Sequence, residues 1–410
     1  MKRRRWLLGG LAAAVFVLPA CREHEAPKPA ARAAPPALDS IRPETQAELP
    51  TTAGEIAMGN LVGQTQVVEG DTIRRPKDAN NLQHLIALVT TKAQFTGSIA
   101  GRERTLKLAE DLVQLAPTDP RSYVERAQAR SAFHLFDEAL ADLAEAEKLH
   151  AKPSDLDEER ASIAQARGDL DAALVLRTKA RDQRPSIVTR AQLAAVLGEL
   201  GRTEEAEKLF REAARGYHDV SPFPVAWLFF QEGLMWERAG ESGRARAFFQ
   251  EAHERLPAYV HAASHLARYE PTKAVALLQP AAASSDDPEI ELGLATALRK
   301  AGDQAGADLH LAHVRARYDE LVEKHRAGYA EHAASFWLDE RTAPAKALEL
   351  AKDNLKVRHS SSAFELALLA AKAANAPADG CAIGKEAKAM PHASEMLVKL
   401  ADEACKDSKP

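Results

Sequence analysis

The sequence lacks the short motifs that mark most common enzyme classes. Its 410 residues contain no Walker A loop, no glycine-rich dinucleotide fingerprint, no His-Glu-x-x-His, no Cys-x-x-Cys and no Gly-x-Ser-x-Gly. Such motifs supply the phosphate-binding loop, the zinc ligands or the nucleophile of the corresponding enzymes. Their absence argues against phosphoryl transfer, hydride transfer and the familiar hydrolases. We therefore expect a protein that is not an enzyme and that uses no cofactor.

Aromatic side chains and β-branched runs are also scarce. Phe, Trp and Tyr make up 5% of the chain, while Ala, Leu, Glu and Arg are abundant. This composition favours helix almost throughout. A chain of this length is too long for one ordinary core, so it predicts several domains or a repeat array.

Basic residues form no stripe along the chain. The net charge is -5 at pH 7 and becomes -9 once the four basic residues at positions 2–5 are removed. Proteins that bind nucleic acid neutralise its phosphates with clusters of Lys and Arg. The mildly acidic body therefore predicts no nucleic-acid partner.

Residues 1–20 have the organisation of an export signal. The basic positions 2–5 precede an apolar run over residues 6–17, which is too short to cross a bilayer of about 30 Å as a helix. The run ends in Leu-Pro-Ala-Cys at positions 18–21, which resembles the lipobox of bacterial lipoproteins.

The lipobox resemblance implies that the chain is cleaved before Cys21 and lipidated on it. The protein would then be anchored to a membrane of the cell envelope. Arg22 follows the cysteine where lipoproteins of the inner membrane have Asp, which favours the outer membrane, with the body facing the periplasm. The alternative is an ordinary secretory signal that is cleaved nearby.

Only two cysteines remain after Cys21, namely Cys381 and Cys405. An even pair in an exported chain is a disulfide candidate. The two residues lie near opposite ends of consecutive predicted helices, over about 378–390 and 392–405, and these ends meet in an antiparallel hairpin. The alternative is two buried free thiols.

Residues 21–76 lack the pattern of the rest of the chain. Proline and alanine dominate as far as about Pro50, which indicates a disordered tether between membrane and body. The segment from Thr51 to Pro76 is ambiguous and could form a short helix or a docked extended segment.

From residue 77 to 390 a repeating pattern of small residues predicts pairs of helices. A small residue on a first helix is followed twelve positions later by another on a second helix, and a large apolar residue often comes four positions after that. Two helices cross closely only where their side chains are small. Glycines at the turn between the helices suit a C-cap with positive φ. The small pairs are Ala93/Thr105, Ala127/Ala139, Ala161/Ala173, Ala194/Ala206, Gly233/Ala245, Ala262/Ala274, Ala295/Ala307 and Ser335/Ala347, and the turn glycines are Gly168, Gly201, Gly240 and Gly302.

This order of small, small, large and small residues resembles the tetratricopeptide repeat (TPR), whose period is 34 residues. The second-helix positions mostly step by 33 or 34 residues, with irregular steps of 39, 29 and 40. The resemblance implies an all-α fold, a right-handed superhelical solenoid of about eight or nine helix-turn-helix repeats. Residues 391–410 carry the polar helix and tail expected to cap the end of a solenoid.

The TPR resemblance also implies a concave groove, lined by the first helices, that receives peptides or partner helices. Aromatic anchors beside charged residues are typical of such binding surfaces. In the alternative, Trp227 and Phe230 fill an irregular junction between repeats. The predicted groove residues are Trp227, Phe230, Leu234, Glu237, Arg238, Arg299 and Lys300.

Two pairs of histidines have spacings that place them on one helix face, His261 with His265 and His310 with His313. A zinc site needs three or four ligands, and the sequence identifies no third ligand for either pair. We therefore interpret them as solvated or capping histidines and predict no metal site.

These features together predict a lipid-anchored scaffold or adaptor. Its groove would bind a segment of another envelope protein, for example during assembly of an envelope or secretion machine. One alternative is a self-associating structural lipoprotein, and a weaker one is a metal-binding or enzymatic protein.

Overall fold

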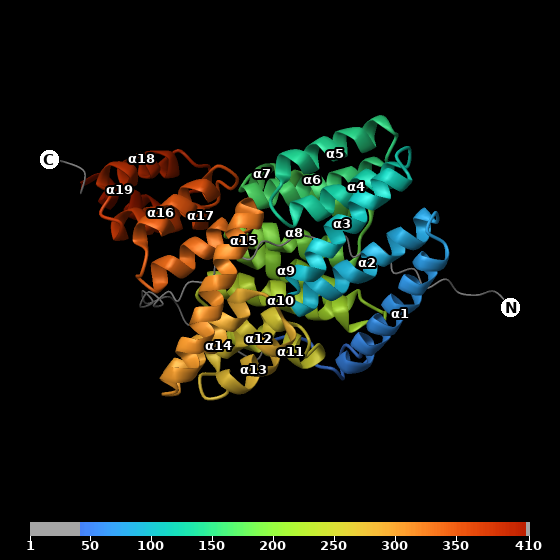
Figure 1. Ribbon diagram of the computed structural model, residues 1–410, viewed down its shortest axis with the longest axis horizontal. Helices are drawn as coiled ribbons and strands as arrows, with labels where there is room; N and C mark the ends of the chain where they lie inside the picture. The colour runs from blue at the N-terminus through green and yellow to red at the C-terminus, as the bar shows by residue number, and fades with distance from the viewer. Residues whose placement is uncertain (1–41, 407–410) are drawn as a thin grey trace.

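The computed structural model describes residues 42–406, and these residues form α-helices joined by short turns (Figure 1). The predicted signal at 1–20 and the lipidation site Cys21 lie outside the described residues. The helices are α1 (Gly54–Arg74), α2 (Ala79–Thr96), α3 (Ile99–Leu115), α4 (Pro120–Ser131), α5 (Phe136–Lys148), α6 (Pro153–Arg167), α7 (Leu170–Gln183), α8 (Ile187–Glu199), α9 (Thr203–Arg215), α10 (Pro222–Arg238), α11 (Ser242–Arg255), α12 (Val260–Tyr269), α13 (Ala274–Ser284), α14 (Pro288–Lys300), α15 (Gln304–Asp339), α16 (Pro344–Leu355), α17 (Ser361–Ala373), α18 (Pro377–Lys388) and α19 (Glu395–Lys406).

Consecutive helices pack as antiparallel hairpins, as the sequence predicts. All sixteen small residues of the predicted pairs are buried, because they lie where the two helices of each hairpin cross. The four turn glycines have positive φ, between 74° and 89°. The TPR-like solenoid is therefore confirmed at the level of its repeating unit.

The eight predicted hairpins run from α2/α3 to the pair that ends in α16. Helix α15 belongs to two of them, because His325 interrupts it with non-helical angles of φ -138° and ψ 52°. Its first part closes the seventh hairpin and its second part opens the eighth. A ninth hairpin, α17/α18, is followed by α19 at the predicted position of the cap.

The start of the described chain differs from the predicted tether. Residues 42–50 lie against the body, where the buried Arg255 donates hydrogen bonds to the carbonyl oxygens of Glu44 and Leu49. The ambiguous segment forms the 21-residue helix α1, which buries Leu61 and Val68. The prediction of a disordered tether as far as Pro50 is therefore wrong for its last residues, because Arg255 offers donors that their carbonyl groups accept.

The solenoid coils so tightly that successive turns of its superhelix touch. Asp286 accepts hydrogen bonds from the backbone N–H groups of Ile99 and Ala100, at 2.6 and 2.9 Å, and so caps α3 from 186 or more residues away. The ring of Phe133 stacks on His325 with centroids 4.2 Å apart. Arg358 donates to the carbonyl oxygen of Ala166 at 2.9 Å. In Figure 1 the C-terminal helices accordingly lie beside α7.

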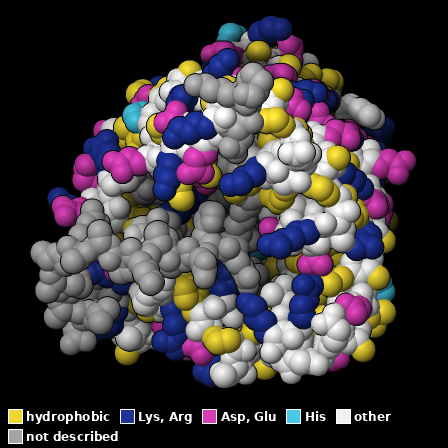
Figure 2. Space-filling view, turned by 90° about the vertical axis from the view of Figure 1, so that its left-hand side faces the viewer, with side chains coloured by type: hydrophobic (Ala, Val, Ile, Leu, Met, Phe, Trp, Pro, Cys, Tyr) yellow, Lys and Arg dark blue, Asp and Glu magenta, His cyan; other side chains and the backbone are white. Residues whose placement is uncertain are grey.

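Cys381 and Cys405 form a disulfide between α18 and α19, with an S–S distance of 2.02 Å. The bond closes the terminal hairpin where the sequence placed its candidate pair. Within residues 42–406, no helix combines the length and the apolar character needed to cross a membrane. On the face shown in Figure 2, basic and acidic side chains are interspersed.

Candidate functional site

A cavity that is partly open to solvent lies at the centre of the molecule, between the superhelical turns. Its wall is built from α2, α3, α4, α10, α15 and the starts of α12 and α14. It offers about 120 Å³ to the centres of water-sized molecules, roughly ten times what one buried water needs. This cavity occupies the place where the sequence predicted an open concave groove.

Trp227 and Phe230 lie in the wall of this cavity. They are 3% and 1% exposed, so their rings lie in the wall of the cavity and not on the outer surface, and their role in binding a partner stays a prediction. Phe230 packs against Tyr259 and His265 with ring centroids 4.9 and 5.2 Å apart. The reason is closure of the superhelix, which turns the inner face of α10 into an interior surface.

The other predicted groove residues do not join these two rings in one surface. Leu234 is buried, and Glu237 is held by His265 and by the hydroxyl of Tyr269, at 3.0 and 2.9 Å. Arg238 and Arg299 lie near the ends of α10 and α14, where Arg299 pairs with Glu340 at 3.1 Å. Lys300 is the exposed last residue of α14.

Two polar groups of the cavity wall have no hydrogen-bond partner among the described residues. Glu125 lines the wall and makes no hydrogen bond or ion pair with any described residue. Burial raises the pKa of its carboxyl to about 7, opposed by the charge of Arg121. The Nε2 atom of Gln231, a residue that is 4% exposed, also lacks a hydrogen-bond partner. Gln231 is buried and Glu125 is half-buried. Buried polar groups are normally satisfied, so the unpaired amide of Gln231 indicates that the cavity holds water or a ligand.

Another part of the wall is an internally paired polar network around the start of α14. Asp287 caps this helix by accepting from the N–H of Glu289 at 3.0 Å, and the Nδ1 atom of His332 lies 3.4 Å from a Glu289 oxygen. Burial raises the pKa of Asp287, with Glu289 adding to the effect and Arg102 opposing it. Burial lowers the pKa of His261 to about 3. Arg102 and His332 thus balance the nearby carboxyl groups, which leaves Glu125 as an acid without such a partner.

Sequence reasoning missed Glu125 and Gln231. Both lie on helices that were correctly predicted, but Glu125 is one of many charged residues on helix surfaces. Only the contact of α2–α4 with α12–α15 places it on a cavity wall, where it is half-buried, and no local pattern signals that contact. The groove mapping did find Trp227 and Phe230, because the first helices of the repeats do line the inner face.

The raised pKa of Glu125 predicts a specific pH dependence. A carboxyl with a pKa of about 7 when folded and near 4.5 when unfolded binds more protons in the folded state between these values. The free energy of unfolding therefore falls as pH rises through this window, by at most about 3 kcal/mol. We expect Glu125→Gln to leave stability at pH 5 nearly unchanged and to raise it at pH 8.5, as measured by urea unfolding.

Glu138→Gln is the matched control for this prediction, because Glu138 is exposed on the neighbouring helix α5. It removes the same charge outside the cavity and should give the same stability difference from wild type at both pH values. A Glu125→Gln variant that is destabilised equally at both pH values would contradict the assignment of an uncompensated acid.

The two predicted histidine pairs have different surroundings. His261 and His265 are buried at 6% and 3% exposure, and His265 is bound to Glu237. His310 and His313 lie at the surface of α15, where Glu291 from α14 faces both of them. The second pair therefore has the third ligand-type side chain that the sequence did not identify.

Comparison with known proteins finds similarity to solved structures only. No known protein family and no curated protein matches the sequence. The chain is similar to the human IFIT1 dimer solved with PPP-AAAA, with a TM-score of 0.44 and 14% identity over 87% of this chain and 92% of that chain. It is also similar to yeast Tom70, with a TM-score of 0.34 and 12% identity over 85% of this chain and 93% of that chain. At these identities and scores, the likeness indicates neither a ligand nor a partner.

Proposed function

We propose that this chain is a non-catalytic binding scaffold of the bacterial cell envelope, and that its cavity receives an ammonium group from its partner. The helical hairpins provide the rigid frame. The observation that carries the proposal is the unpaired carboxyl of Glu125 on the wall of a cavity that the unsatisfied amide of Gln231 also lines.

Two features support a place in the envelope. The N-terminal signal and Cys21 resemble those of lipid-anchored proteins. The disulfide between Cys381 and Cys405 is of the kind that persists in oxidising compartments such as the periplasm. The anchor and the outer-membrane location are part of the proposal.

An ammonium group fits the chemistry of this part of the wall. A cation near Glu125 favours the ionised carboxylate and so removes the cost of its burial. Trp227 and Tyr259 line the same cavity, and the faces of aromatic rings attract cations. The group comes from a small free amine or from a lysine or N-terminal amine of another envelope protein.

The test compares wild type, Glu125→Gln and Glu138→Gln, each expressed as the full chain and isolated from the membrane fraction. Native mass spectrometry detects a bound small amine, and crosslinking in intact cells detects a protein partner. Loss of a charged hydrogen bond costs about 1.5–3 kcal/mol. In one of the two experiments we therefore expect Glu125→Gln to reduce occupancy by about tenfold or more, with Glu138→Gln like wild type.

The outcomes distinguish a free amine from an amine on a partner protein, and both of these from binding elsewhere on the chain. A mass shift without a crosslinked partner identifies a free amine, and the reverse identifies a protein. A partner that all three proteins capture equally would place binding elsewhere and contradict the role of the cavity. Crosslinks between copies of this chain alone would favour self-association.

A further inference from the structure

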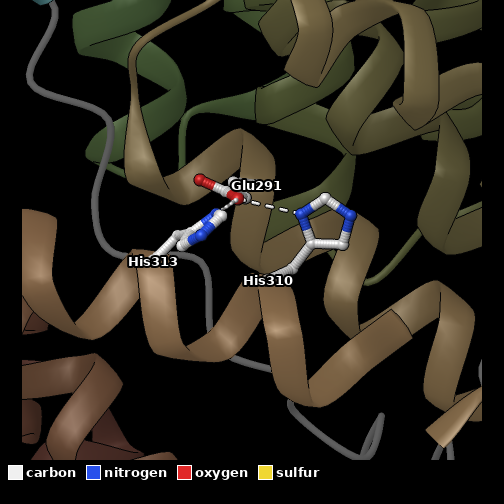
Figure 3. Close-up of side chains that lie close together, drawn as sticks. All are labelled: Glu291, His310 and His313. Carbon is white, nitrogen blue, oxygen red and sulfur yellow. Dashed lines mark hydrogen bonds and ion pairs between the residues drawn. The ribbon is translucent and has the colours of Figure 1, made fainter. Parts of the chain in front are cut away.

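A second cluster of ligand-type side chains lies at the surface between α14 and α15, and it has no part in the proposed cavity function. Glu291 projects from α14, while His310 and His313 project from α15 (Figure 3). The Oε1 atom of Glu291 lies 2.8 Å from Nδ1 of His310 and 3.3 Å from Nδ1 of His313. One ligand atom from each residue lies within 4.8 Å of those of the other two.

The hairpin geometry explains why these three residues meet. Side chains three apart share one face of a helix, so His310 and His313 point in the same direction. The turn between α14 and α15 reverses the chain, which brings the first turns of α14 opposite the second and third turns of α15. Glu291 is therefore placed against both histidines by the packing that defines the repeat.

The ligand set and its exposure suit a metal ion. Two imidazoles and one carboxylate are the protein ligands of several zinc sites that keep a coordination position open. The side chains of Glu291, His310 and His313 are 26%, 29% and 64% exposed, so an ion and its remaining water ligands can reach the cluster from solvent.

We propose that Glu291, His310 and His313 form a binding site for a divalent transition-metal ion such as Zn²⁺, with water completing the coordination. Without a metal, both Nδ1 atoms approach the same carboxylate oxygen, which requires a proton on each of them. A metal ion replaces both protons and draws the three ligand atoms to one centre. The site joins the two helices of the seventh hairpin.

The experiment measures Zn²⁺ binding by isothermal titration calorimetry to the mature protein purified without a histidine tag. Co²⁺ serves as a spectroscopic substitute that reports the ligand set. Loss of an outer-shell partner alone weakens metal affinity by about 10–100-fold, so loss of a direct ligand should weaken it at least as much. We expect one Zn²⁺ per chain in wild type and an affinity at least about tenfold lower in His310→Ala, His313→Ala and Glu291→Gln.

His84→Ala is the matched control, because His84 is an exposed histidine on α2, far from this hairpin in sequence. It should bind Zn²⁺ like wild type, and so should Glu125→Gln, which keeps this result independent of the cavity. Zn²⁺ should also slow hydrogen exchange in residues 288–313 of wild type but not of His313→Ala. Equal affinity in wild type and in the three ligand variants would overturn the proposal, as would the absence of Zn²⁺ binding by the wild type.

Discussion

Replacing Arg358 by Met should lower the free energy of unfolding by about 3–5 kcal/mol, the range measured when one partner of a buried ion pair is removed. The guanidinium of Arg358 pairs with Glu331, and the two side chains are 6% and 2% exposed. It also donates from Nε to the carbonyl oxygen of Ala166. The substitution leaves a buried carboxylate without its partner and cuts a bond between successive superhelical turns. Urea unfolding measures the loss, and hydrogen exchange at residues 160–170 locates it.

Arg326→Met is the control for Arg358→Met. Arg326 also pairs with acidic residues of α16, Glu349 and Asp353, but its side chain is 45% exposed. Exposed pairs contribute about 0–1 kcal/mol, so this variant should remain close to wild type. Replacing Glu331 and Arg358 together by Met should recover most of the stability, because apolar side chains of similar volume often substitute well for a buried pair. Equal losses of unfolding free energy in Arg358→Met and Arg326→Met would contradict the buried position of Arg358.

The hairpins were predictable because their determinants are local. Small residues twelve positions apart decide where two consecutive helices cross, and turn glycines such as Gly201 and Gly302 supply the left-handed caps at φ of 74° and 89°. Both features lie within one repeat and can be recognised in a single sequence. Helix α1 was harder to predict, because Ile56, Val67 and Ile73 are exposed and so obscure the apolar face that packs against α2.

The candidate site was only partly predictable because it depends on contacts between distant repeats. The mapping of first helices pointed to Trp227 and Phe230, and both residues line the cavity. It could not show that the face that carries them lies against other repeats, since that depends on contacts such as the one between Asp286 and Ile99, which are 187 residues apart. The same limit applies to Glu291, whose role became visible only when the hairpin placed it beside His310 and His313.

Replacing Gly168 by Ala tests whether the α6–α7 turn touches the backbone of the 358–360 segment. A Cβ at this position would lie 2.5 Å from the carbonyl oxygen of His359 and 3.0 Å from the backbone nitrogen of Ser360. Backbone atoms cannot rotate away as a side chain can, so the α6–α7 turn and the 358–360 segment would have to separate. We expect the positive φ of 89° to cost about 1–2 kcal/mol and the clash to add about 1–3 kcal/mol.

Gly302→Ala isolates the first of these two effects, the cost of the positive φ. Gly302 also has a φ of 89° and also ends the first helix of a hairpin, but a Cβ there would meet nothing within 4 Å. In urea unfolding, Gly302→Ala should therefore lose only the stability that the positive φ costs. It should leave hydrogen exchange at residues 357–361 unchanged. Gly168→Ala should lose more stability and should speed exchange in that segment, where His359 donates its N–H to Arg167. Similar behaviour of the two variants would mean that the superhelical turns do not touch there.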